Sequence, residues 1–473
     1  GDTAHHLAVG HQILATGAVP LTDTFSHAHV GGTFIDWEWL AEAVFAGMDL
    51  LLGLNGVGLL SASLIAGTLY GLCRWMMARG LHPVPALLIG LLAAVTSEIH
   101  WLARPHLFSF ALLLGVLYLL EEVRAGRAAI RRLAAIPPLL ALWANLHAGF
   151  VTGLLVCGAY LAGALIELGI AYRRAGRAGL AQEARPAAHV RAFGLTLGAA
   201  TLATLLNPYG AGLHLHIFEF VRHPLLTRIT VEFLPPDFRQ PITWAFLVML
   251  AGMGALLIAV RGRIAAAHAL LLLAWTIFSL QAARNIFQFS ILVPGLLAPQ
   301  VVQLLNRARG LLGRYRTPAG LRQGRPVLFV GTLAVMLLVA TFSGRDGRGP
   351  GLRARWTSPP FPLGAVAWLQ TDPAAPHGKM FNTMTWGGYL LTTLYPAHQI
   401  FVDSQQDVYG EALTRDYLTI ESLAPGWDTL LDRHGVTWVI EPVGSPLVAA
   451  LRARPDQWAE LYTDPAAAIL SRR

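Results

Sequence analysis

Ten apolar runs, most of them close to twenty residues long, constrain the fold of this chain more than any other feature. A helix of about 20 apolar residues crosses the hydrocarbon core of a bilayer. Only 13% of the residues are charged, against about 25% in a typical soluble protein. The sequence therefore predicts a polytopic α-helical membrane protein and excludes a soluble enzyme, a disordered chain and a disulfide-stabilised secreted domain. The runs cover approximately residues 54–77, 83–98, 106–121, 133–146, 149–172, 190–206, 241–260, 264–281, 286–304 and 326–343.

The arginines are divided unequally between the loops that join these runs. Nineteen of those before residue 344 lie in or beside one alternating set of loops, and five lie in or beside the other set. Loops rich in arginine and lysine stay in the cytoplasm. The net charge of +8 therefore reflects topology, and we expect no nucleic-acid partner. Residue 1 and the tail after residue 344 fall outside the cytoplasm, so we also expect a membrane-crossing helix upstream of residue 1.

Changes in composition divide the chain into four regions. Residues 1–53 read as a first outer loop with two amphipathic helices, and residues 54–343 as a transmembrane domain of about ten helices. Residues 344–357, rich in Gly and Arg, read as a linker. Residues 358–473 are less apolar, and strand-like runs alternate there with helix-like runs. This alternation predicts a small α/β domain with a largely parallel sheet.

The expected elements of that domain follow from its hydrophobic patterns. Strands are expected at Lys379–Asn382, Gln399–Asp403, Thr437–Glu441 and Ala467–Ser471. Helices are expected at Leu363–Thr371, Trp386–Tyr395, Gly410–Ser422, Trp427–His434 and Pro446–Arg454.

Ionisable and amide side chains gather at the predicted outer face of the membrane. Charged groups near membrane depth are costly and usually line a cavity, so we expect a polar cavity that opens to the outside. Asp2 with His5 and His6 would place a carboxylate beside two imidazoles on one helical face, which suits a general base with an orienting partner. The candidate site residues are Asp2, His5, His6, Asp36, Glu38, His100, Arg104, His106, Asn145, His147, Arg284 and Asn285.

Several of these residues also have an ordinary structural explanation. Asp2 and Asp36 could cap the helices that follow them, and Glu38 could interact with a helix dipole. Arg104 and Arg284 could reach lipid headgroups. No strong zinc motif is present, so we expect no zinc centre. A divalent cation, Mg²⁺ or Mn²⁺, held by the carboxylates together with a phosphate is compatible with the residues.

Several strings of residues resemble certain bacterial multi-spanning proteins of the GT-C type, which are membrane glycosyltransferases that use lipid-phosphate-linked sugars. The resemblance extends over nearly the whole chain, and the strings of the first outer loop are its most specific part. The sequence departs from it at Thr3-Ala4, where relatives carry aromatics, and at Asp403-Ser404-Gln405, where relatives carry Asp-Gly-Arg. The matching strings are Asp2-Thr-Ala-His5-His6, Ile35-Asp36-Trp37-Glu38-Trp39, Arg104-Pro105, Trp143-x-Asn145-x-His147, Asn207-Pro208-Tyr209-Gly210, Arg284-Asn285, Trp386-Gly387-Gly388-Tyr389 and Val402-Asp403.

The resemblance implies a role for these residues. In GT-C enzymes the catalytic acidic residue lies in the first outer loop, directly after the first transmembrane helix, and Asp2 occupies that place here. Asp36 and Glu38 form a second acidic cluster of the same loop. The implied reaction is an inverting transfer in which a carboxylate deprotonates the acceptor and an arginine binds the donor phosphate. The histidines, Arg104, Asn145, Arg284 and Asn285 would bind substrate.

The resemblance also implies partners and a location. The partners are membrane lipid and a polyprenyl-phosphate sugar donor, and the C-terminal domain is the candidate surface for a partner protein. The location is the bacterial inner membrane, with the site and the C-terminal domain outside the cytoplasm. The alternative function is a non-catalytic membrane subunit or scaffold that keeps the fold and binds a partner, because a fold does not dictate a function.

Overall fold

The computed structural model describes residues 2–179, 184–260, 264–312, 354–357 and 360–473. The chain divides into two compact units. The first unit combines residues 1–58, 215–229 and 339–473, and the second combines residues 59–214 and 230–338. The beginning and the end of the chain thus belong to one unit, although the long apolar region separates them in the sequence.

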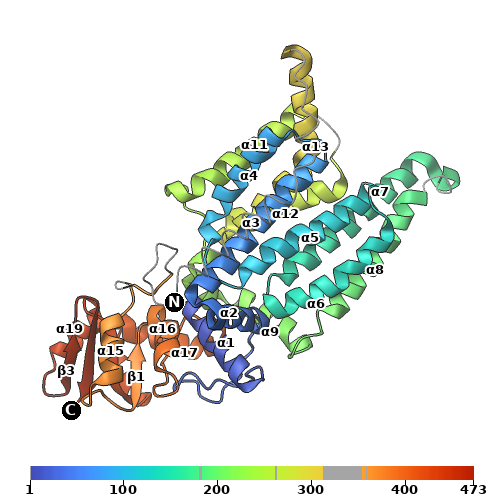
Figure 1. The fold of residues 1–473 in the computed structure, drawn as a ribbon. Coiled ribbons are helices and arrows are strands. Elements are labelled where there is room, and N and C mark those ends of the chain that lie inside the picture. Colours follow the sequence, from blue (N-terminus) through green and yellow to red (C-terminus); the bar gives the residue numbers. More distant parts are fainter. Residues whose placement is uncertain (1, 180–183, 261–263, 313–353, 358–359) are drawn as a thin grey trace. The chain divides into compact units, whose positions relative to one another are not determined.

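The second unit is a bundle of apolar helices (Figure 1). Within the described residues, six helices are long and apolar enough to cross a membrane, and a seventh apolar helix, α12, is shorter. The chain is therefore a multi-pass helical membrane protein, as its apolar runs predicted. The helices are α3 (Leu54–Ala78), α4 (Pro83–Ser97), α5 (His106–Arg124), α6 (Ile136–Leu146), α7 (Phe150–Gly179), α8 (Ala184–Ala203), α11 (Trp244–Val260), α12 (Ala266–Gln281) and α13 (Ile286–Leu312).

Nine of the ten predicted runs coincide with these helices, and the run 326–343 lies outside the described residues. The run 133–146 is shortened to α6, which has 11 residues. Pro137 and Pro138 stand in its first turn, where proline costs no helical hydrogen bond. A 3₁₀ turn over Ile130–Ala135 leads into it.

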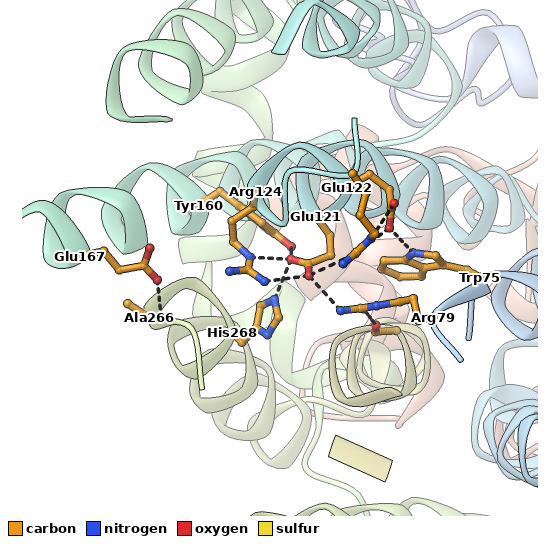
Figure 2. Close-up of polar contacts among 11 residues, drawn as sticks. Trp75, Arg79, Glu121, Glu122, Arg124, Tyr160, Glu167, Ala266 and His268 are labelled. Atoms are coloured by element: carbon orange, nitrogen blue, oxygen red, sulfur yellow. Dashed lines mark hydrogen bonds and ion pairs between the residues drawn. The ribbon is translucent and has the colours of Figure 1, made fainter. Parts of the chain in front are cut away.

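Glu121, a fully buried glutamate on α5, joins four helices of this bundle (Figure 2). Arg79, at the end of α3, donates to its Oε1 at 3.0 Å, and Arg124 donates to its Oε2 at 2.7 Å. The hydroxyl of Tyr160 on α7 and Nε2 of His268 on α12 also bond Oε2, at 3.1 and 2.8 Å. A buried charge is tolerated only when it is paired and hydrogen-bonded, and Glu121 meets both conditions.

Arg79 also compensates for a proline in α13. Pro299 has no N–H, so the carbonyl of Gly295, four residues earlier, lacks its helical partner. Nη1 of Arg79 donates to that carbonyl at 2.5 Å. The ring of Trp75 packs against the same glycine so closely that a Cβ there would lie 2.5 Å from its Cζ3. Arg79 is therefore a structural residue as well as one of the arginines that indicate topology.

The first unit contains a four-stranded sheet with the strand order β1-β2-β4-β3 (Figure 1). β1 pairs in parallel with β2, whereas β4 is antiparallel to both β2 and β3. The prediction of a largely parallel sheet was wrong, because β3 was missed and a short turn joins it to β4. A parallel connection needs a crossover of a dozen or more residues. The strands are β1 (Lys379–Asn382), β2 (Val436–Pro442), β3 (Trp458–Thr463) and β4 (Ala467–Arg472).

The predicted strand Gln399–Asp403 does not join this sheet. It forms a single bridge instead, between Ile400 and Ser26 of the N-terminal segment. The amide of His27 donates to the Ile400 carbonyl at 3.0 Å, and the His27 ring bonds the Met380 carbonyl of β1 at 2.7 Å. Residues about 370 positions apart in the sequence are thus hydrogen-bonded neighbours.

The helices of the first unit cover the sheet and hold the N-terminal segment on it. α1 (Asp2–Thr16) packs against α2 (Trp39–Leu52) and against α16 (Met384–Leu394). One apolar core contains Val9 of α1 together with Phe381 and Val439 of the sheet. The segment predicted as an outer loop therefore shares its core with the C-terminal domain. The other helices are α15 (Leu363–Thr371), α17 (Gln406–Glu421), α18 (Trp427–Arg433) and α19 (Pro446–Arg452), with α9 (Ala211–Arg222) and α10 (Pro224–Ile229) from the middle of the chain.

Candidate active site

A small pocket in the first unit lies where the loop before α2 meets α1 and the start of α17. It contains about 210 Å³ of space not filled by atoms, part of which is open to solvent. Three carboxylates and one imidazole line it beside aromatic and aliphatic side chains. Its lining residues are His5, Phe34, Ile35, Asp36, Trp37, Glu38, Gln405, Asp407 and Val408.

Asp36 and Glu38 are positioned by the loop that they occupy. The Oδ1 atom of Asp36 accepts a hydrogen bond from the Glu38 amide at 2.9 Å, which is the local turn that aspartate favours. α2 begins at Trp39, so Asp36 does not cap that helix, which was its ordinary structural explanation. Glu38 is the residue before the helix and makes no side-chain cap. Neither carboxylate caps α2, and both line the pocket.

His5 forms a buried ion pair with Asp403, a residue 398 positions later in the chain. The Nδ1 and Oδ2 atoms lie 2.5 Å apart. Asp403 also accepts hydrogen bonds from the Gln405 amide at 2.9 Å and the Tyr409 hydroxyl at 3.0 Å. Burial alone would lower the pKa of His5 and raise that of Asp403, but their mutual attraction reverses both directions. Each group therefore favours the charged form of the other, and the His5 imidazole lies at the pocket wall.

Glu42 lies behind the pocket, on the buried face of α2. Its Oε1 is 2.8 Å from Nδ1 of His6 and 4.0 Å from Nε2 of His5. Burial, followed by the neighbouring Asp36 and Glu38 carboxylates, raises the pKa of Glu42 well above its ordinary value. Burial also raises the pKa of Asp36, although a hydrogen bond from Glu42 opposes that shift. Glu42 is thus the carboxyl of this cluster that holds a proton most readily.

Three of these residues could hold a metal ion. The ligand atoms of His6, Glu38 and Glu42 all lie within 4.8 Å of one another, and all three residues are buried. One imidazole and two carboxylates form a donor set that suits Mn²⁺ or Zn²⁺ better than Mg²⁺, which prefers oxygen ligands. The residues fit a divalent ion, which would also offset the crowding of negative charge around Glu42.

Asp2 lies in the first turn of α1 and is half-buried. Its charge contributes to raising the pKa of His5, although less than Asp403 does. Asp2 is not among the described residues that line the pocket. The sequence predicted Asp2 as the carboxylate partner of His5 and His6, and the structure adds closer-acting partners, Asp403 and Glu42, from other segments.

Replacing Asp403 with asparagine is expected to make the stability of the protein less dependent on pH. Because the pKa of His5 is raised, the pair stabilises the folded state fully below pH 6.5, and this stabilisation is lost as the pH rises through the raised value. Because the pKa of Asp403 is lowered, the pair also stabilises the folded state above pH 3.8, and this stabilisation is lost as the pH falls through the lowered value. The pair thus contributes most between these values. We expect the variant to lose about 3 kcal/mol at pH 6 and less at pH 9. Thermal unfolding at both pH values measures this, and an equal loss at both would contradict it.

The other predicted site residues lie in the second unit. His106 bonds the His100 carbonyl through Nε2 at 2.6 Å, and Nε2 of His100 bonds the Ala283 carbonyl at 3.1 Å. Asn285 donates to the carbonyl of Phe278 at 3.0 Å. These side chains fix the turns between α4 and α5 and between α12 and α13, so the structure gives them a structural role in addition to the predicted one.

Asn145 and His147, at the end of α6, also bond neighbouring protein groups. Asn145 donates to the carbonyl of Leu206 at 2.8 Å, which ties α6 to the end of α8. Nδ1 of His147 accepts from the Ser109 hydroxyl and from the Gly149 amide, both at 2.9 Å. These bonds give both side chains a structural role within the second unit.

The two predicted substrate-binding arginines, of which Arg284 was expected to contact the donor phosphate, meet one short turn of the second unit, a 3₁₀ helix over Val231–Phe233. Arg104 forms an ion pair with Glu232. The guanidinium of Arg284 lies over the ring of Phe233, with Cζ 4.2 Å from the ring centre. The sequence around Arg284 predicted no acidic group in its own turn. The structure brings one close from about fifty residues away, because Arg284 also interacts electrostatically with Glu232.

Comparison with known proteins identifies the fold. No protein-family model matches the sequence, and no curated protein matches it significantly. The archaeal oligosaccharyltransferase AglB from Archaeoglobus fulgidus, solved with an inhibitory peptide and a dolichol-phosphate, matches with a TM-score of 0.55 at 12% identity over 96% of this chain and 66% of that one. The apo form of the A. fulgidus oligosaccharyltransferase matches with a TM-score of 0.52 at 11% identity, over 93% of this chain and 66% of that one.

The chain therefore has the GT-C fold that the sequence resemblance predicted, and its own architecture is a helical membrane domain with a small C-terminal sheet domain. It spans about two thirds of the length of the oligosaccharyltransferase. A further similar structure, ArnT from Cupriavidus metallidurans bound to undecaprenyl phosphate, has a TM-score of 0.46 at 13% identity, over 100% of this chain and 93% of that one.

Proposed function

We propose that this chain is a membrane glycosyltransferase that moves a sugar from a polyprenyl-phosphate donor to an acceptor hydroxyl on the extracytoplasmic side. The observation that carries the proposal is the pocket of the first unit, in which Asp36, Glu38 and Asp407 are gathered beside His5. GT-C is a fold on which such chemistry is built, and a structure of AglB was solved with a lipid phosphate, dolichol-phosphate. The site supplies the functional argument, since the fold alone does not.

Asp36 is the best candidate for the general base. It lines the pocket, and burial raises its pKa towards the pH at which a base works. Asp36 takes the proton of the acceptor hydroxyl while that oxygen bonds to the anomeric carbon. The bond between this carbon and the phosphate oxygen breaks, and the phosphate leaves with its lipid. Asp2 is the alternative base, and Glu38 supports the charge of the cluster.

A separate proposal concerns phosphate recognition within the second unit. Arg104 and Arg284 are its candidates, because a planar guanidinium can bind two phosphate oxygens at once. The inverting course of the reaction follows from a single displacement, in which no covalent sugar–enzyme intermediate forms.

A divalent cation bound by His6, Glu38 and Glu42 is a secondary proposal. Such an ion would supply positive charge near a phosphate when bound. Titration of metal-free protein with Mn²⁺, followed by electron paramagnetic resonance, tests it directly. We expect one bound ion per chain in the wild type and none in Glu42→Gln; equal binding by both proteins would exclude the triad.

We further propose that the chain lies in a bacterial inner membrane with the C-terminal domain outside the cytoplasm, where it is free to meet an acceptor or a partner protein. Single cysteines at the exposed Ala129 and Ala397, in a variant lacking Cys73 and Cys157, test this orientation. In spheroplasts, an impermeant thiol reagent should label position 397 at once, and position 129 only after lysis. Labelling of position 129 in sealed spheroplasts would contradict the topology.

Native mass spectrometry of the purified full chain distinguishes an enzyme of this class from a scaffold. We expect adducts with the mass of a polyprenyl phosphate or of its sugar-loaded form. Membrane phospholipid adducts alone, combined with a stoichiometric partner protein, would favour the non-catalytic alternative.

A further inference from the structure

The two arginines proposed to bind phosphate are both engaged by consecutive residues of one turn. Glu232 pairs with Arg104, and the ring of Phe233 lies under the guanidinium of Arg284. Arg104 precedes α5, and Arg284 precedes α13, so they come from two different turns of the bundle. The short segment Val231–Phe233 therefore contacts both guanidinium groups.

Backbone contacts hold this segment beside the two arginines. The amide of Ala283 donates to the carbonyl of Leu234 at 2.9 Å, directly after the 3₁₀ turn. The carbonyl of the same Ala283 bonds His100, which lies four residues before Arg104. The turns that carry Arg104, Glu232 and Arg284 thus meet around Ala283.

Glu232 is an anion in this position. Burial opposes its ionisation, but the charges of Arg104 and then Arg284 outweigh burial and lower the pKa of the carboxyl. Two guanidiniums and one carboxylate leave one positive charge in excess. A carboxylate also presents its two oxygens to a guanidinium in the way that a phosphate does. Glu232 therefore has the charge and the shape of a small phosphate substitute.

We propose that Glu232 is an internal substitute for the lipid phosphate: it occupies the site of Arg104 and Arg284 when no donor is bound, yields to the phosphate of an incoming lipid, and returns as the lipid phosphate leaves. The proposal rests on the proposed function only for the kind of ligand, a phosphate carried by a polyprenyl chain. It adds a residue that sets how tightly that ligand is held and how fast it is released.

The exposure of the turn is consistent with such a movement. The side chains of Arg104 and Glu232 are 26% and 37% exposed, so water already reaches their ion pair. Ion pairs of this kind contribute little to stability. Val231 on the same turn is 76% exposed, so its movement uncovers little buried apolar surface. The sugar-loaded donor is a phosphodiester with one negative charge, equal to that of Glu232, and the released polyprenyl phosphate is a monoester with up to about two, so both can compete with Glu232.

Binding of geranyl phosphate to the purified full chain tests the proposal, with isothermal calorimetry as the measurement. If Glu232 fills the site about nine-tenths of the time, Glu232→Gln should bind about 10-fold tighter than the wild type, because the competent fraction rises to one. Arg104→Ala and Arg284→Ala should each bind at least about 10-fold weaker. Asp237→Asn is the matched control, since Asp237 lies in the same segment but pairs with Arg239. It should bind as the wild type does.

Several results would overturn the proposal. Glu232→Gln binding no tighter than the wild type would show that Glu232 does not compete with the phosphate. Equal binding of geraniol would show that the site recognises the lipid chain, and equal binding of inorganic phosphate would show that it takes free phosphate. Failure of the proposed function looks different: Arg104→Ala and Arg284→Ala would then bind geranyl phosphate as tightly as the wild type.

Discussion

Asp36→Asn is expected to lower sugar transfer by at least about 100-fold while leaving the protein folded. Asparagine keeps the size of the side chain and can still accept the hydrogen bond from the Glu38 amide. It cannot take the proton of an acceptor hydroxyl. The loss should appear in kcat as well as in kcat/KM, because the proton transfer occurs in the transition state.

Three companion variants make this result specific. Asp49→Asn is the matched control, since Asp49 lies on α2 and bonds His11 outside the pocket lining; its activity should match that of the wild type. Glu38→Gln should cause a smaller loss than Asp36→Asn. If Asp2→Asn abolishes transfer while Asp36→Asn remains active, the base is Asp2, as the sequence resemblance implied.

Glu121→Ala is expected to destabilise the protein by about 3–5 kcal/mol. The change leaves Arg79, Arg124 and His268 without the carboxylate that joins their helices (Figure 2). An unpaired charge at this depth is much more costly than the loss of one hydrogen bond. Glu121→Gln should cost less, because the amide still accepts one of these bonds.

Thermal unfolding in detergent, followed by tryptophan emission, measures this effect. Glu167→Gln is the control, because the Glu167 carboxylate accepts a hydrogen bond from the Ala266 amide at 3.2 Å, which a glutamine side chain can also accept. It should unfold near the wild-type temperature. If Glu121→Ala does so as well, the buried cluster is not what holds the four helices together.

The sequence was sufficient to predict the membrane fold, because helix length and hydropathy are local properties. It was not sufficient for the sheet. The run Gln399–Asp403 has the composition of a strand, yet its partner is Ser26, and no local pattern indicates a contact across that distance. The missed strand β3 has a mixed burial pattern, with Trp458 buried and Glu460 exposed, so its alternation is weak.

The candidate site could be predicted only in part, because some of its contacts also join residues that are far apart in the sequence. Asp36, Glu38 and His5 could be identified from their concentration in one segment, and all three line the pocket. Glu42 could have been found, since it follows Glu38 by four residues and lies in the first turn of α2. Asp403 stood in a string that carried the family resemblance, but its pairing with His5 depends on the packing of the C-terminal domain against α1.

The charged residues of the bundle illustrate a further limit. Arg79 and Arg124 were interpreted through topology alone, whereas the structure assigns them to Glu121. Glu232 gave no signal, because its partners Arg104 and Arg284 lie about 130 residues before it and about fifty residues after it. Ion pairs between distant segments require the three-dimensional arrangement.

The central claim is that the pocket of the first unit catalyses transfer from a polyprenyl-phosphate donor. The most direct measurement is the release of undecaprenyl phosphate from a panel of radiolabelled undecaprenyl-phosphate hexoses by the full chain in proteoliposomes, with cell-envelope extract as the source of acceptor. We expect release from at least one donor by the wild type, and at least about 100-fold slower release by Asp36→Asn and by the double variant Asp2→Asn, Asp36→Asn. Equal release by the wild type and both variants would contradict it.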